Sequence, residues 1–213
     1  MKTLFFGIVL ILLIGIGGFV YRNVAERPAI GGELACPALA KVCPDGSTVG
    51  HVDGSCDFAA CPAPNVELTA ARIGFALPAG YVPVASLPGS LGTYEKKTAS
   101  STHTIAVYNY AIPAGKTGND VILDVTEFSP SGQKPETMDK FSPVFVNGKT
   151  FQGVTIERFE GQVESAYYLT REQDVLRFEI VERGVDWTNP DLVIDSLPEH
   201  KALLKMLGTL QTN

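Results

Sequence analysis

Four cysteines, all between residues 36 and 61, are the side chains best suited to bind a metal or to form covalent links. Cys36 and Cys43 are separated by six residues, Cys43 and Cys56 by twelve, and Cys56 and Cys61 by four. Structural zinc sites pair ligands about two to four residues apart, and the first gap is too long for that. Clustered cysteines in an even number instead predict disulfides formed in an oxidising compartment.

The pairing of these cysteines is left open by the sequence, because four cysteines allow three connectivities. A nested arrangement, Cys36 with Cys61 and Cys43 with Cys56, serves as the working hypothesis. Read as a calcium loop from Asp45, the segment CPDGSTVGHVDGSC has Ser and Val at the third and fifth positions, where acidic or amide side chains are needed, and no Glu at the twelfth. Its Asp-Gly pairs are typical of turns. We therefore predict no metal and no cofactor.

The remaining titratable residues form no recognisable catalytic arrangement. His51, His103 and His200 lie far apart in the chain and are predicted to be surface or loop residues. The sequence has no Gly-x-Ser-x-Gly element for an acyl-transfer serine, and no pair of carboxylates is placed by its pattern. We therefore predict no catalytic residue and a non-catalytic protein, with an envelope enzyme of unrecognised site as the alternative.

The segment from Thr3 to Tyr21 is uncharged and apolar throughout. At about 1.5 Å per residue, a helix of this length matches the hydrocarbon core of a bilayer. A cleaved signal peptide needs small residues before its cleavage site, and Asn23 occupies that place in Asn23-Val24-Ala25. We predict a retained single-pass helix that contacts membrane lipid through residues 3–21, with the cysteines and everything after them outside the cytoplasm.

The formal net charge of −6, without any cluster of Lys and Arg, argues against nucleic-acid binding. The domain organisation predicted is a cytoplasmic tip and transmembrane helix over 1–24, a linker with the four-cysteine segment over 25–64, and an extracytoplasmic domain over 65–213. Alternating apolar residues predict strands near 73–77, 91–97, 103–112, 154–159, 163–170 and 175–183, and Asn147-Gly148 predicts a tight hairpin.

Two further segments are expected to be helical. The stretch ETMDKF, residues 136–141, can form a short helix. Residues 120–128 fit a helix or a strand by pattern alone, and their Val, Ile and Thr content favours the strand. A capping box, Ser196-x-x-Glu199, predicts the start of the last helix. Its apolar stripe, expected to lie on the sheet, consists of Leu203, Met206, Leu207 and Leu210. An antiparallel meander with a closing amphipathic helix is an α+β fold.

Aromatic residues supply the one candidate binding surface. Tyr108 and Tyr110 share a face of their predicted strand, because residues two apart point the same way. Together with Tyr167 and with Trp187 in the loop GVDWTNPD, they form a possible patch for an envelope protein partner. Ordinary packing of the sheet is the competing interpretation.

Two parts of the chain show three resemblances to known families. CPDGSTVG followed by CDFAACP resembles a four-cysteine segment of uncharacterised membrane-anchored envelope proteins of candidate-phylum bacteria, which implies an extracytoplasmic bacterial protein. The same segment is faintly similar to the centre of a Kazal inhibitor, although an outer pair of cysteines is missing, so a truncated protease inhibitor is a further alternative. The order of strands and closing helix is similar in pattern to PsbP-like domains, which implies a binding or assembly module.

Overall fold

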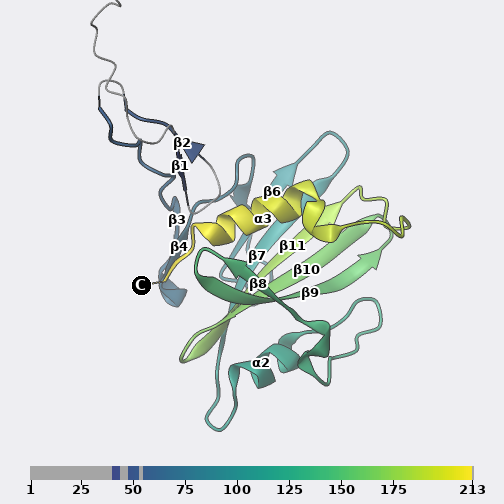
Figure 1. The fold of residues 1–213 in the computed structure, drawn as a ribbon. Coiled ribbons are helices and arrows are strands. Elements are labelled where there is room, and N and C mark those ends of the chain that lie inside the picture. The colour runs from purple at the N-terminus through teal and green to yellow at the C-terminus, as the bar shows by residue number, and fades with distance from the viewer. Residues whose placement is uncertain (1–39, 44–47, 53–54, 213) are drawn as a thin grey trace, which may run out of the picture. The chain divides into compact units, whose positions relative to one another are not determined.

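A computed structural model describes residues 40–43, 48–52 and 55–212 (Figure 1). Contacts divide the chain into two compact units, of which the smaller contains Gly50–Ala59 and the larger Lys41–Val49 and Ala60–Asn213. In the smaller unit, the ring of His51 stacks on Phe58 with centroids 4.3 Å apart. The larger unit contains the sheet, the helices and both sites described below.

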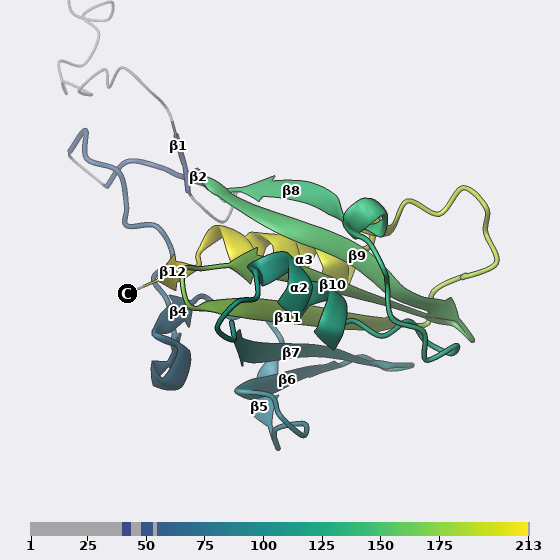
Figure 2. The same cartoon turned by 90° about the horizontal axis from the view of Figure 1, so that it is seen from below.

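A seven-stranded antiparallel sheet forms the centre of the larger unit (Figures 1 and 2), in the order β5-β6-β7-β11-β10-β9-β8. These strands are β5 (Val82–Val84), β6 (Gly92–Lys97), β7 (Thr102–Ala111), β8 (Ser142–Val146), β9 (Lys149–Phe159), β10 (Gln162–Thr170) and β11 (Asp174–Arg183). The predicted antiparallel sheet is confirmed. It consists of two meanders, β5–β7 and β8–β11, which meet where β7 pairs with β11.

Short elements complete the unit. One small sheet pairs β4 (Ile73–Phe75) with β3 (Val66–Leu68) and β12 (Gln211–Thr212), and another pairs β1 (Lys41–Val42) with β2 (Thr48–Val49). Three single turns are 3-10 helices: η1 (Thr69–Ala71), η2 (Met138–Lys140) and η3 (Ile194–Ser196). The predicted helix over 136–141 is thus reduced to η2.

The hairpin between β8 and β9 forms as predicted. Val146 pairs with Lys149, and the two turn residues, Asn147 and Gly148, have φ of 44° and 74°. Positive φ at both positions gives a turn whose twist matches that of the strands, which is why Asn-Gly favours it.

The expectation of a strand over 120–128 is wrong, because helix α2 (Gly118–Val125) occupies this segment. Thr117 caps it: its hydroxyl oxygen accepts the backbone N–H of Asp120, and the Asp120 carboxylate accepts the N–H of Thr117. The cap satisfies N–H groups that a helix start leaves unpaired. Val121 and Ile122 are then buried against one face of the sheet.

Helix α3 (Pro198–Gly208) covers the opposite face (Figure 2). Its predicted apolar stripe is buried. The predicted capping box is wrong, because Leu197 is the N-cap residue and no side chain of the cap accepts a hydrogen bond. The backbone N–H groups of Glu199 and His200 donate instead to the carboxylate of Glu182 on β11, each at 3.2 Å. The side chain of a residue on strand β11 therefore caps this helix.

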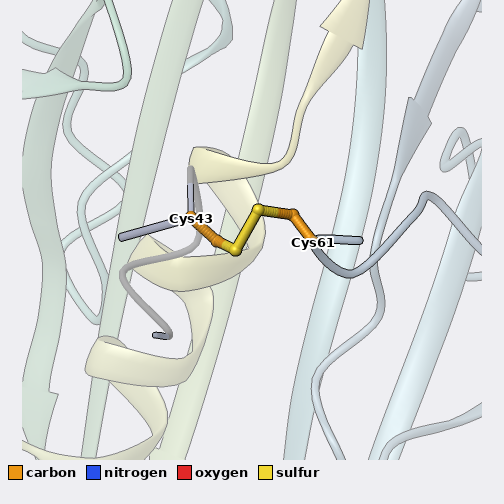
Figure 3. The surroundings of a disulfide bond; sticks show 2 residues. All are labelled: Cys43 and Cys61. Atoms are coloured by element: carbon orange, nitrogen blue, oxygen red, sulfur yellow. A yellow bond between two sulfur atoms is a disulfide. The ribbon is translucent and has the colours of Figure 1, made fainter. Parts of the chain in front are cut away.

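The nested disulfide hypothesis is wrong, because Cys43 is bonded to Cys61 (Figure 3), with Cα atoms 5.6 Å apart. Cys56 is disulfide-bonded as well, and Cys36 lies outside the described residues. The predicted span over 3–21 also lies outside them. Within the described part of the chain, no helix is long and apolar enough to cross a membrane.

Candidate functional site

Arg177 lies at the centre of the sheet face that carries α2. Its cross-strand neighbours are Tyr108 on β7 and Tyr168 on β10. The guanidinium carbon is 5.5 Å from the Tyr108 ring centroid and 5.9 Å from that of Tyr168. Arg177 thus holds two aromatic rings by cation–π contacts in the middle of the sheet.

The charge of Arg177 is shared between two carboxylates on the same face. Its Nη2 lies 2.5 Å from Glu179 Oε2 and 3.8 Å from Glu164 Oε1, and its Nη1 donates to the carbonyl oxygen of Val125 on α2. No described residue accepts a hydrogen bond from its buried Nε. All three charged side chains are nearly buried, with exposed fractions of 11%, 13% and 17% for Arg177, Glu179 and Glu164. Of the two carboxylates, Glu164 lies farther from the Arg177 charge and is neutralised less by it.

Burial, and secondarily repulsion from Glu179, raises the pKa of Glu164 to about 7. The same side chain lines a small surface hollow of about 240 Å³ whose rim includes Glu127 and the ring of Phe128. Among the described residues that line this hollow, two are acidic and none is basic, while the Nζ of Lys140 lies 4.7 Å from the ring centroid of Phe128. The hollow is therefore suited to a cation.

Tyr108 and Tyr110 are partly exposed beside this charge group and stack on each other, with centroids 6.2 Å apart and planes 12° from parallel. Burial, followed by the charge of Glu179, raises the pKa of Tyr108 to about 12. Burial also raises the pKa of Tyr110, so both tyrosines are neutral at physiological pH. We call Tyr108, Tyr110, Glu164, Arg177 and Glu179 the tyrosine–arginine face.

The structure brings together only part of the predicted aromatic patch. Tyr108 and Tyr110 share one face, whereas Tyr167 lies on the opposite face of the sheet, in the core under α3. Trp187 packs on Phe159, with ring centroids 5.1 Å apart. Arg177, Glu179 and Glu164 were missed as site residues, although strand alternation already places Arg177 and Glu179 on one side of β11.

The pKa of Glu164 makes stability depend on pH. Because its pKa rises from 4.5 to about 7 on folding, the stabilisation is complete below pH 4.5 and is lost as the pH rises through 7. The free energy of unfolding should therefore fall by roughly 2–3 kcal/mol over this range on account of Glu164. Urea titrations at pH 5 and pH 8 measure this difference in the free energy of unfolding. In Glu164→Gln the part of the difference that comes from Glu164 should be absent. Equal pH dependence in both proteins would contradict the assignment.

A second polar group lies on the other face of the sheet. His200 on α3 is fully buried; its Nδ1 is 3.0 Å from Glu182 Oε2 and its Nε2 is 3.0 Å from Ser165 Oγ on β10. The prediction that His200 is a surface or loop residue is therefore wrong. His103 is also buried, on β7, with its Nε2 3.2 Å from Ser101 Oγ. Nothing in the spacing of Ser165, Glu182 and His200 along the chain indicates that they meet.

The hydrogen-bonded residues Ser165, His200 and Glu182 connect to further polar groups in two directions. Next to Glu182, Glu199 accepts hydrogen bonds from Lys96 Nζ at 2.7 Å and from Tyr81 Oη at 3.0 Å. On the other side, Ser165 lines a pocket of about 310 Å³ formed by β8, β9, β10 and the loop before α3. Tyr167 lines the same pocket and donates to Asp195 at 3.4 Å.

The chain matches no protein-family model and no curated protein. One similar solved structure is a protein of Bacteroides thetaiotaomicron VPI-5482, with 9% identity, a TM-score of 0.40, and coverage of 67% of this chain and 45% of that one. This chain therefore spans less than half of that protein. Another is the cyanobacterial PsbP (CyanoP) of Synechocystis sp. PCC 6803, with 13% identity, a TM-score of 0.44, and coverage of 76% of this chain and 99% of that one. A PsbP-like structure is thus among the similar structures, at an identity that carries no property of it to this chain.

Proposed function

We propose that the chain is a membrane-anchored extracytoplasmic binding or assembly module that takes a basic side chain of a protein partner at its tyrosine–arginine face. The observation that carries this proposal is Glu164, a nearly buried carboxylate that lines an acidic hollow while Arg177 is engaged mainly by Glu179. A Lys or Arg from a partner would supply the positive charge that Glu164 lacks.

The rings of Tyr108 and Tyr110 also favour the binding of a cation. The faces of Tyr108 and Tyr110 carry negative electrostatic potential, and Arg177 already exploits the Tyr108 ring in this way. The two rings are stacked and partly exposed, so a long basic side chain can lay its methylene groups on them while its head group reaches the carboxylates.

Two features outside this face support the proposed location of the module. Residues 3–21 form an uncharged apolar segment that suits a membrane anchor. The Cys43–Cys61 disulfide supports an oxidising compartment, since disulfides persist outside the cytoplasm.

Protease added outside intact cells should therefore digest the domain over 65–213, and protection of that domain would contradict this placement.

Photo-crosslinking in native membranes tests the binding face. In the full-length chain, p-benzoylphenylalanine in place of Tyr108 should give one discrete adduct with a protein partner. The same substitution at Phe145 on the edge strand β8, which is 78% exposed, is the matched control. The adduct should form from position 108 even when detergent-solubilised lipid is added before irradiation. It should be absent from position 145. Equal crosslinking from both positions, or none from Tyr108, would overturn the proposal.

A further inference from the structure

Ser165, His200 and Glu182 form a linear hydrogen-bonded chain that joins three elements, β10, α3 and β11. Both contacts of the imidazole are 3.0 Å long. An ionised Glu182 can only accept hydrogen bonds, so Nδ1 of His200 carries a proton. In the neutral ring, Nε2 is then an acceptor for the hydroxyl proton of Ser165. This is the order of groups in which a serine is activated as a nucleophile.

A purely structural role explains only part of this chain. Glu182 caps α3 by accepting the N–H groups of Glu199 and His200, and His200 fills the space between the helix and the sheet. The hydroxyl of Ser165 in turn supplies the hydrogen-bond partner that the buried Nε2 of His200 needs, at 3.0 Å. Ser165, which is 3% exposed, is the only one of the three residues that lines the 310 Å³ pocket, and His200 behind it is fully buried. The structural role does not explain why the hydroxyl borders a pocket.

We propose that Ser165 is the nucleophile of a site that hydrolyses carboxylic esters, with His200 as general base and Glu182 as the residue that positions it. Ser165 Oγ bonds to the ester carbonyl carbon and gives its proton to His200 Nε2. The bond from that carbon to the alcohol oxygen breaks, and the alcohol leaves with this proton. Water then attacks the acyl-serine, its proton passes through Nε2 to Ser165 Oγ, and the carboxylic acid is released.

The pocket restricts the substrate to a small ester. Its volume of about 310 Å³ lies at the lower end of the range of ligand pockets. Thr155 is the direct cross-strand partner of Ser165, is exposed, and lines the same pocket. Side chains so paired lie about 5 Å apart at Cβ, and we assign the Thr155 hydroxyl as a donor to the carbonyl oxygen as its charge develops.

Covalent labelling of the full-length protein tests this site. A fluorophosphonate probe should phosphonylate Ser165, with loss of fluoride, and peptide mass spectrometry should locate the adduct there. Ser142 lines the same pocket without a histidine contact among the described residues and is the internal control, so it should stay unlabelled. Ser165→Ala should abolish the adduct and reduce hydrolysis of p-nitrophenyl acetate to the rate without protein.

Two variants test the roles of Glu182 and Thr155, and the second separates catalysis from folding. Glu182→Gln should slow labelling by about 10²- to 10⁴-fold, and its half-maximal rate should move to lower pH because the imidazolium loses its counter-charge. Thr155→Val should slow it by about 10²-fold, while its thermal unfolding midpoint stays that of the unaltered chain. No adduct at Ser165 in the folded protein, or labelling unaffected by both variants, would overturn the inference. Either result leaves the Tyr108 crosslink unchanged, because that face lies across the sheet.

Discussion

Replacing Glu182 by alanine is expected to lower the free energy of unfolding by about 3–5 kcal/mol. Glu182 is 4% exposed and accepts three hydrogen bonds, from the backbone N–H groups of Glu199 and His200 and from the His200 ring. Without it, a fully buried imidazole and the start of α3 lose their acceptor at once, and each unpaired buried group adds a desolvation cost. Urea unfolding followed by circular dichroism measures the loss.

Glu182→Gln is the matched control for that experiment. The glutamine side chain keeps the volume and one oxygen that can still accept from the backbone of α3. Its expected loss is therefore smaller, about 1–2 kcal/mol. A loss below about 1 kcal/mol for Glu182→Ala, or equal losses for both variants, would contradict the view that Glu182 holds the helix to the sheet.

The second large effect is expected at Arg177. Arg177→Met keeps much of the apolar packing but leaves Glu179 and Glu164 without the charge that compensates them, and should cost about 3 kcal/mol at pH 8. The loss should be smaller at pH 5. There Glu164 is already mostly protonated, given its pKa of about 7, and burial also raises the pKa of Glu179.

Arg183→Met provides the comparison on the same strand. Arg183 is exposed, and its Nη1 donates to the carbonyl oxygen of Thr102. Its replacement should change stability by no more than about 0.5 kcal/mol. In the double variant Arg177→Met with Glu179→Gln, part of the lost stability should return, because one of the uncompensated carboxylates is gone. Additive losses in the double variant would show that the two residues are not coupled.

The central strands could be predicted because each carries a clear alternation. In β11, Leu176, Phe178 and Ile180 are fully buried on the face under α3, and Arg177 and Glu179 point the other way. The hairpin at Asn147-Gly148 follows from local turn geometry alone. Such features depend on neighbours in sequence, which is why the predicted boundaries of β6, β7, β10 and β11 agree with the structure to within one residue, whereas β9 begins at Lys149 and not at residue 154.

Helix α2 was missed for a physical reason. Val121, Ile122, Val125 and Thr126 favour strands intrinsically, but the Thr117–Asp120 cap and burial of Val121 and Ile122 against the sheet favour the helix. The cap was overlooked because Asp stands where a capping box usually has Glu or Gln. The start of α3 was misassigned for the converse reason: its cap comes from Glu182, a residue of the sheet.

The residues of the candidate sites also divide into those placed by local sequence and those placed by tertiary contacts. The pairing of Tyr108 with Tyr110 is a local property of one strand and was predicted. The position of Glu164 beside Arg177, and the meeting of Ser165, His200 and Glu182, depend on the register of β10 against β11 and on where α3 lies on the sheet. No spacing in the sequence encodes that register, so these groups became visible only in the folded chain.

The most direct test of the proposed binding face is the pH dependence of the Tyr108 crosslink. A basic side chain should bind best when Glu164 is ionised, so the crosslink yield should rise severalfold between pH 6 and pH 8, across the Glu164 pKa of about 7. In Glu164→Gln the yield should be low and independent of pH. A yield that is unaffected by pH in the unaltered chain, or equally high in Glu164→Gln, would contradict recognition of a cation at this face.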